Sequence, residues 1–188
     1  MPGPGFWLEL AGFGLAVAMV VCNWRVNPLA WPLAMASSAV YGLLFLQAQL
    51  YATAALQLVF IAVAAWGWWQ WLRGRGDDGT PLRVGRLSRR GLAAALAATA
   101  LLWPLIALAL QRFTDSTVPW WDALPTAGSL VAQVLLARKR LENWAGWLAV
   151  NLVSIGLFAS QGLWLTVAVY AVFAAMSVVG WRTWRRML

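Results

Sequence analysis

Seven stretches of this chain are each long and apolar enough to cross the hydrocarbon core of a bilayer, which takes about 20 residues. They cover residues 6–22, 28–47, 52–71, 91–111, 120–137, 144–160 and 164–182. Of the 188 residues, 62% are hydrophobic and 11% are charged, far from the balance of a soluble domain. The sequence therefore predicts an all-α integral membrane protein, with residues 1–188 forming a single transmembrane domain. Because no basic n-region or cleavage site is apparent near residue 1, we expect the first span to remain in the mature protein.

The residue types present exclude most enzyme classes. The chain has no histidine and a single cysteine, so it cannot build a His-based triad, a His/Cys zinc site or an intrachain disulfide. It has no Gly-rich nucleotide-binding loop either, so we expect no cofactor and no direct use of ATP. An intramembrane aspartyl protease would need two carboxylates deep in the membrane, whereas Glu9 and Asp122 lie near predicted outer helix ends. These two carboxylates have two interpretations: they touch substrate, or they complement the helix dipole.

The basic residues predict how the chain is oriented. Thirteen of the fourteen Lys and Arg residues fall on one side of the predicted membrane, and only Arg112 falls on the other. The thirteen lie between apolar runs rather than on a polar face, so we expect topology signals and no nucleic-acid partner. By the positive-inside rule the N-terminus is outside and the C-terminus cytoplasmic. The long connection at 72–90 is then a solvated cytoplasmic loop.

An internal repeat divides the spans into two groups of three. Shifting the sequence by 113 positions lays residues 7–71 over 120–184 with seventeen identities in 65 positions. The matches include Trp31 with Trp144 and the shared ending Gly-Trp-x-x-Trp. Two three-helix repeats at 6–71 and 120–184, joined by a linker helix at 91–111, make a parallel 3+1+3 arrangement like that of the SWEET proteins. In transporters of this design the substrate site lies near the midplane, where the two halves meet.

Polar and aromatic residues share helix faces within these repeats, because positions three, four and seven apart lie on one face. Polar groups at bilayer depth usually face a bundle interior or a water-filled path. The candidate substrate-binding residues are Ser38, Tyr41, Gln57, Gln133, Trp144, Trp147, Asn151, Ser154, Tyr170 and Trp181.

Each candidate also has a purely structural interpretation. Serines in membrane helices often bond to their own backbone or pack against neighbours, which applies to Ser37, Ser129 and Ser154. Asn151 and Gln57 are equally open to a structural and a binding role. Trp residues at predicted interfaces, such as Trp120 and Trp164, fit an aromatic belt.

Two segments carry a resemblance to a known family. The segments NWRVNPLAWPLAMASSAVYGLLFLQAQLYATAALQLVFIAVAAWGWWQW and ENWAGWLAVNLVSIGLFASQGLWLTVAVYAVFAAMSVVGWRTW resemble the two halves of the PnuC vitamin transporters. The family's Trp-x-x-Trp feature is present as Trp144 and Trp147. Its Gly-x-x-x-Trp endings are present as Gly67 with Trp71, and as Gly180 with Trp184.

The resemblance implies facilitated diffusion of nicotinamide riboside through a homotrimer in the bacterial cytoplasmic (inner) membrane, among its lipids, followed by trapping through cytoplasmic phosphorylation. Thiamine and riboflavin are the alternatives within the family, and a SWEET-like sugar porter shares the helix plan. The aromatic faces favour a flat ring over a plain sugar, since cation–π contacts supply about 2 kcal/mol when desolvated. A structural or signalling seven-helix protein is the rival class, against which the matched polar stripes argue.

The orientation can be tested with reporters. A reporter fused after Leu188 is expected to be active only in the cytoplasm, and one placed before Met1 only outside, because the basic residues hold their side of the membrane inside. Measuring both fusions in cells checks this. Activity of both reporters on the same side would mean an even number of spans and would contradict the 3+1+3 repeat.

Overall fold

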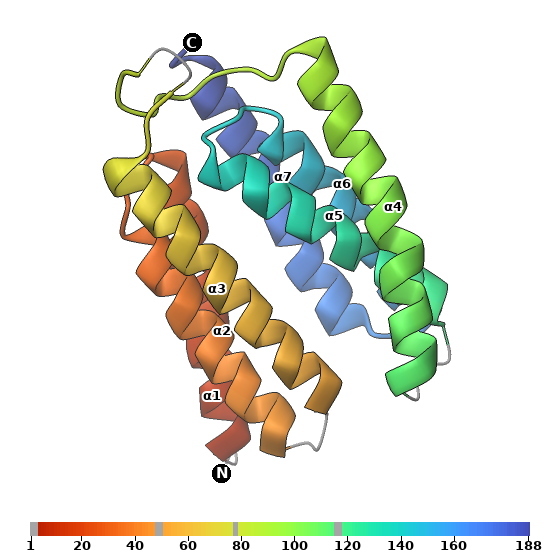
Figure 1. The fold of residues 1–188 in the computed structure, drawn as a ribbon. Helices are drawn as coiled ribbons and strands as arrows, with labels where there is room; N and C mark the ends of the chain where they lie inside the picture. The colour runs from red at the N-terminus through yellow and green to blue at the C-terminus, as the bar shows by residue number, and fades with distance from the viewer. Residues whose placement is uncertain (1–3, 48–50, 77–78, 115–117) are drawn as a thin grey trace. The chain divides into compact units, whose positions relative to one another are not determined.

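The computed structural model describes residues 4–47, 51–76, 79–114 and 118–188. Within them the chain forms seven α-helices (Figure 1), each beginning and ending within about three residues of a predicted span. The all-helical prediction is thus confirmed for the described residues. The helices are α1 Pro4–Trp24, α2 Ala30–Gln47, α3 Tyr51–Arg73, α4 Arg89–Phe113, α5 Pro119–Ala137, α6 Asn143–Ser160 and α7 Trp164–Arg185.

Four of the helices are long and apolar enough to cross a membrane by length and composition alone. These are α2, α4, α7 and the Ala54–Arg73 part of α3, while the apolar part found in α1, Leu10–Trp24, is shorter. Helices α5 and α6 fall outside this group and carry several of the predicted site residues, among them Gln133 and Asn151.

The helices pack into two compact units, Met1–Leu82 and Arg83–Leu188. In the first unit α2 packs against both α1 and α3, and in the second the contacts run α4 to α5, α5 to α6 and α6 to α7. The helix predicted as a linker, α4, is thus part of the second unit. Its Trp103 indole donates a 2.8 Å hydrogen bond to the carbonyl of Trp120 at the start of α5, and the two rings meet edge to face.

Each unit is centred on a tryptophan seated on a glycine. In the first unit Trp31 of α2 covers Gly67 of α3 and meets Trp71 edge to face, with ring centroids 5.5 Å apart. In the second unit Trp144 of α6 covers Gly180 of α7 and meets Trp184 in the same way, also at 5.5 Å. All four rings are buried. The absence of a glycine side chain lets each indole lie directly on the neighbouring helix backbone.

The turns that precede these tryptophans also match. The two non-glycine residues with positive φ in the described chain are Val26 (φ 53°) and Lys139 (φ 50°), which are 113 positions apart. Each follows a helix, α1 or α5, and is flanked by the same backbone bonds: Asn27 N–H to Cys22 O in one unit, and Arg140 N–H to Leu135 O in the other. A left-handed residue costs an L-amino acid about 1–2 kcal/mol, so both turns keep the same strained geometry.

Part of the connection predicted as a solvated loop at 72–90 makes defined backbone hydrogen bonds. Its second half lies against the α5–α6 turn through backbone bonds from Gly85 N–H to Lys139 O and from Leu141 N–H to Gly85 O. The Glu142 carboxylate also accepts a bond of 2.9 Å from Leu87 N–H. Sequence periodicity did not reveal this packing because the bonds are made largely by backbone atoms. Burial also lowers the pKa of the Lys139 side chain in this turn.

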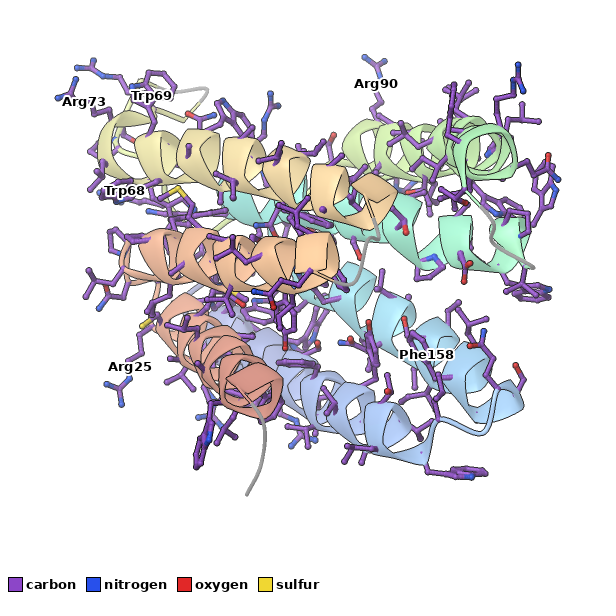
Figure 2. The ribbon with its side chains drawn as sticks, turned by 90° about the horizontal axis from the view of Figure 1, so that it is seen from below. Arg25, Trp68, Trp69, Arg73, Arg90 and Phe158 are labelled. Atoms are coloured by element: carbon purple, nitrogen blue, oxygen red, sulfur yellow. The ribbon has the colours of Figure 1, made fainter. Side chains whose placement is uncertain are left out.

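The outer surfaces of the helices are apolar, as expected for contact with lipid. Helix α4 exposes a series of leucines: Leu92, Leu96, Leu101, Leu105 and Leu108. Several tryptophans assigned to the aromatic belt are also exposed near helix ends, among them Trp7, Trp69, Trp121 and Trp164. At one end of the first unit, Figure 2 shows Arg25 and Arg73 together with Trp68 and Trp69, which is the pattern of a basic, aromatic membrane interface.

The glycine seats can be tested by adding one methyl group. In Gly180→Ala the new Cβ would come within 2.5 Å of the Trp144 ring, so we expect a loss of about 1–3 kcal/mol in stability from overpacking. Thermal unfolding in detergent measures it. Gly156→Ala is the matched control on α6, because no described atom lies within 4 Å of its added Cβ. Equal stability of the two variants would contradict the proposed seat.

Candidate functional site

The α6–α7 interface is built from three layers spaced seven residues apart on both helices. The facing pairs are Trp144 with Trp184, Asn151 with Ser177, and Phe158 with Tyr170. The two helices run in opposite directions, so the residue number rises along α6 as it falls along α7. We call these pairs the tryptophan layer, the polar layer and the stacked layer. A spacing of seven keeps residues on the same side of a helix, which explains why one seam carries all three.

The tryptophan layer is a packing core. Trp144 is 3% exposed and Trp184 is completely buried. The Trp144 indole N–H has no hydrogen-bond partner among the described residues, and the same holds for Trp31 in the first unit. Both rings are enclosed by protein, so in this structure Trp144 packs the helices rather than presenting a ring face.

The polar layer links the two helices by hydrogen bonds. The Asn151 side-chain Nδ2 donates to Ser177 Oγ over 3.3 Å, and Ser177 Oγ donates to the Phe173 carbonyl one turn back on α7 over 2.8 Å. Asn151 is 5% exposed and Ser177 is 4% exposed. The layer is therefore a buried amide whose orientation is held by a hydroxyl.

The stacked layer consists of two nearly parallel aromatic rings. Phe158 of α6 and Tyr170 of α7 have centroids 5.3 Å apart and an interplanar angle of 21°. Both side chains are half-buried, and Figure 2 shows Phe158 on α6. This partly exposed aromatic pair lies about two turns along α6 from the buried amide, so one seam carries both apolar faces and a hydrogen-bonding group.

Helix α5 approaches the other side of α6 closely through small residues. A Cβ at Gly128 would lie 2.8 Å from Val150, and one at Gly146 would lie 3.2 Å from Ala132. Small residues commonly let membrane helices come together in this way. Gln133, next to Ala132, is 7% exposed and joins Asn143, Asn151, Ser154 and Ser177 among the buried polar residues of the second unit.

The first unit keeps the tryptophan layer but not the other two. At the positions that match Asn151 and Ser177 it has Ser38, which is half-buried, and Ala64, which is buried. Tyr41 stacks on Phe45 of its own helix at 6.3 Å. Gln57 packs its Cβ against Gly42, where an added Cβ would lie 3.5 Å away.

Ser37 has a packing role in the first unit. Its hydroxyl donates a 3.1 Å hydrogen bond to the Gly12 carbonyl and so joins α2 to α1, which agrees with its structural interpretation.

The remaining candidates are placed as follows. Ser154 is buried at 2% exposure, while Trp147 and Trp181 are half-buried. Asp122 lies in the first turn of α5, where a negative charge complements the helix dipole. The side chain of Glu9 lies outside the described residues. That the candidates of the two halves line one path stays a prediction.

Three residues of the seam, Phe158, Ser177 and Trp184, were not among the predicted substrate-binding residues. All three lie on the polar and aromatic faces predicted for the last two spans, and the one that bears a hydrogen-bonding group in the polar layer is Ser177. The signal that could have identified it is the seven-residue spacing of Tyr170, Ser177 and Trp184, which repeats that of Trp144, Asn151 and Phe158. No group of three His, Cys, Asp or Glu residues in the described part of the chain could hold a metal ion.

The sequence of this chain is similar to those of known membrane transporters. A family model described as nicotinamide mononucleotide transporter matches residues 6–186. The chain is 31% identical over 183 residues to a riboflavin/roseoflavin transporter of Streptomyces davaonensis, covering 95% of this chain and 84% of that protein. It is 26% identical over 209 aligned positions to the nicotinamide riboside transporter PnuC of Escherichia coli, with the same coverage of each.

A solved structure is also similar. The crystal structure of the vitamin B3 transporter PnuC aligns with a TM-score of 0.77 at 22% identity, covering 96% of this chain and 81% of that one. At this identity the match concerns the fold.

Proposed function

The chain belongs to the PnuC family of vitamin transporters, and we propose that its own substrate is nicotinamide riboside, carried across the inner membrane by facilitated diffusion. As a family member it is an integral membrane transporter rather than an enzyme. Downhill movement fits the absence of a nucleotide-binding motif from the sequence. Phosphorylation in the cytoplasm would then trap the vitamin, and this coupling is taken from the family.

The observation that carries the proposal is the buried Asn151 amide on the same helix seam as the Phe158–Tyr170 stack, about two turns away along α6. Nicotinamide riboside has a cationic ring, a carboxamide and ribose hydroxyls. Aromatic faces attract a cationic ring, and an amide can bond to a carboxamide or a hydroxyl. The polar and stacked layers together supply both kinds of group on one helix seam.

Riboflavin is the second candidate. It is favoured by the 31% identity to the riboflavin/roseoflavin transporter, which is higher than the 26% identity to the PnuC protein of E. coli. Riboflavin is a larger flat ring with an imide N–H, which aromatic faces and an amide would also suit. Uptake by an auxotrophic strain that expresses the chain, with both labelled vitamins offered in parallel, separates the two candidates.

We also propose that the chain arose by duplication as a parallel 3+1+3 arrangement, with the N-terminus outside and the C-terminus inside. The support is the pair of matched tryptophan seats and the pair of matched left-handed turns, each 113 residues apart. Assembly as a homotrimer among membrane lipids follows from the family resemblance. The exposed leucines of α4 are compatible with lipid or with a neighbouring copy.

Downhill transport makes a simple prediction about the end point. Uptake of nicotinamide riboside into sealed vesicles is expected to need neither ATP nor an ion gradient and to stop when the two sides are equal. Labelled substrate inside and outside the vesicles is measured over time, with empty vesicles as the control. Accumulation above the outside concentration would contradict facilitated diffusion.

The amide residues can be tested by separating binding from stability. Asn151→Ala is expected to cost little stability, because hydrogen bonds between membrane helices average about 0.6 kcal/mol. Losing a ligand hydrogen bond costs about 1–3 kcal/mol, which weakens binding roughly five- to 150-fold. We expect the same pattern for Gln57→Ala.

Affinity and thermal stability are measured side by side for these variants. Trp164→Phe serves as the control, since Trp164 is 69% exposed at the start of α7. If both amide variants had lower thermal stability but unchanged affinity for the ligand, Asn151 and Gln57 would only pack the helices, and their proposed role in binding would be wrong.

A further inference from the structure

The hydroxyl of Ser177 can form a hydrogen bond with Asn151 in only one direction. Its proton is used in the 2.8 Å bond to the Phe173 carbonyl, which is one turn earlier on the same helix. A hydroxyl carries one donor and two acceptor sites. Towards α6, Ser177 Oγ can therefore only accept a hydrogen bond.

This restriction decides how the Asn151 amide is turned. The end of the amide that faces Ser177 must be the NH2 group. If the side-chain amide were flipped by 180°, Asn151 Oδ1 would lie against Ser177 Oγ, whose only proton is already donated to the Phe173 carbonyl. The observed bond, from Nδ2 to Oγ at 3.3 Å, has this arrangement. Amide orientation is normally assigned from such networks, and here the network leaves one solution.

The other end of the amide is then available. Asn151 Oδ1 makes no hydrogen bond to any described residue. This oxygen is not among the fully buried unpaired atoms of the described residues, so it keeps accessible surface and can accept a hydrogen bond from a ligand. The acceptor faces away from Ser177 on the seam that also holds the Phe158–Tyr170 stack.

We propose that Ser177 is a positioning residue that sets the hydrogen-bond polarity of the binding site. By holding the NH2 group of Asn151, it presents Oδ1 to the substrate and selects ligands that donate an N–H, a carboxamide or a cyclic imide, over carboxylates of the same shape. This inference rests on the proposed function, since it assumes that Asn151 contacts the substrate. It goes further by stating which ligand chemistry the contact accepts.

The two units differ at this point. The residue that matches Ser177 in the first unit is Ala64, and the one that matches Asn151 is Ser38. An alanine cannot hold an amide, and a serine hydroxyl can rotate to either donate or accept. The polarity of the site is therefore set by the second unit.

Direct binding of paired ligands tests the proposal. The probes are nicotinamide riboside with its carboxylate analogue nicotinate riboside, and riboflavin with N3-methylriboflavin, which lacks the imide N–H. The purified full chain is expected to prefer the N–H ligand of whichever pair it binds. In Ser177→Ala the amide is free to turn, so the preference is expected to fall about tenfold, mainly through weaker binding of the N–H ligand. Ser177→Thr keeps a hydroxyl that can bond one turn back and is expected to restore the preference to within about twofold.

A matched control lies on the same helix. The Thr183 hydroxyl makes the same kind of bond, 2.9 Å to the Val179 carbonyl, and has no hydrogen bond to a described residue of α6. Thr183→Ala removes that bond and is expected to leave the ligand preference unchanged. An equal change of preference in Thr183→Ala and Ser177→Ala would overturn the proposal.

Ligand-free NMR separates this inference from the proposed function. The side-chain NH2 protons of Asn151 are expected to exchange with solvent more slowly in the wild type than in Ser177→Ala. Equal exchange would overturn the locking by Ser177 whatever the substrate is. A preference that is unchanged in Ser177→Ala, with only thermal stability reduced, would also overturn it. If the Asn151 NH2 protons exchange more slowly in the wild type than in Ser177→Ala, and the chain binds only riboflavin, the hydrogen-bond polarity set by Ser177 would be supported. Nicotinamide riboside would then be refuted as the substrate.

Discussion

The packing of an indole ring onto a glycine backbone is the contact on which both units depend. Trp31 packs on Gly67 and joins α2 to α3, and Trp144 packs on Gly180 and joins α6 to α7. Trp71 and Trp184 meet these rings edge to face. In lipid there is little hydrophobic gain from bringing helices together, so dispersion contacts of large, well-fitted rings carry much of the association. The register of the polar and stacked layers is fixed by this seat, because they follow it at seven-residue steps.

Much of this could be predicted from the sequence. Long apolar runs located the seven helices, since the bilayer dictates their length, and the repeat located Trp31, Trp144 and the paired glycines. The orientation of individual side chains could not be predicted. The structure shows that the Trp144 ring is buried against Gly180 of α7, while its predicted contact with substrate stays a prediction. Ser177 was passed over because its role depends on Asn151 across the interface.

The two units share the packing of their tryptophans but differ in the polar residues that follow. The tryptophan layer is the same in both, but the polar layer is Asn151 with Ser177 in one and Ser38 with Ala64 in the other. A buried polar pair is expensive unless both members are satisfied, so the two positions must change together. The Trp–Gly seats are constrained by shape, whereas the polar layer is constrained by its hydrogen bonds.

The seats also determine the order in which the protein can be made. The seat of the first unit joins Trp31, Gly67 and Trp71, so these residues are all present in the chain before α4 has been synthesised. Domains commonly fold as units during synthesis, the N-terminal one first. The first three helices can therefore settle in the membrane while the ribosome is still extending the chain. Helix α4 then arrives as a segment whose own packing partner, α5, is the next to emerge.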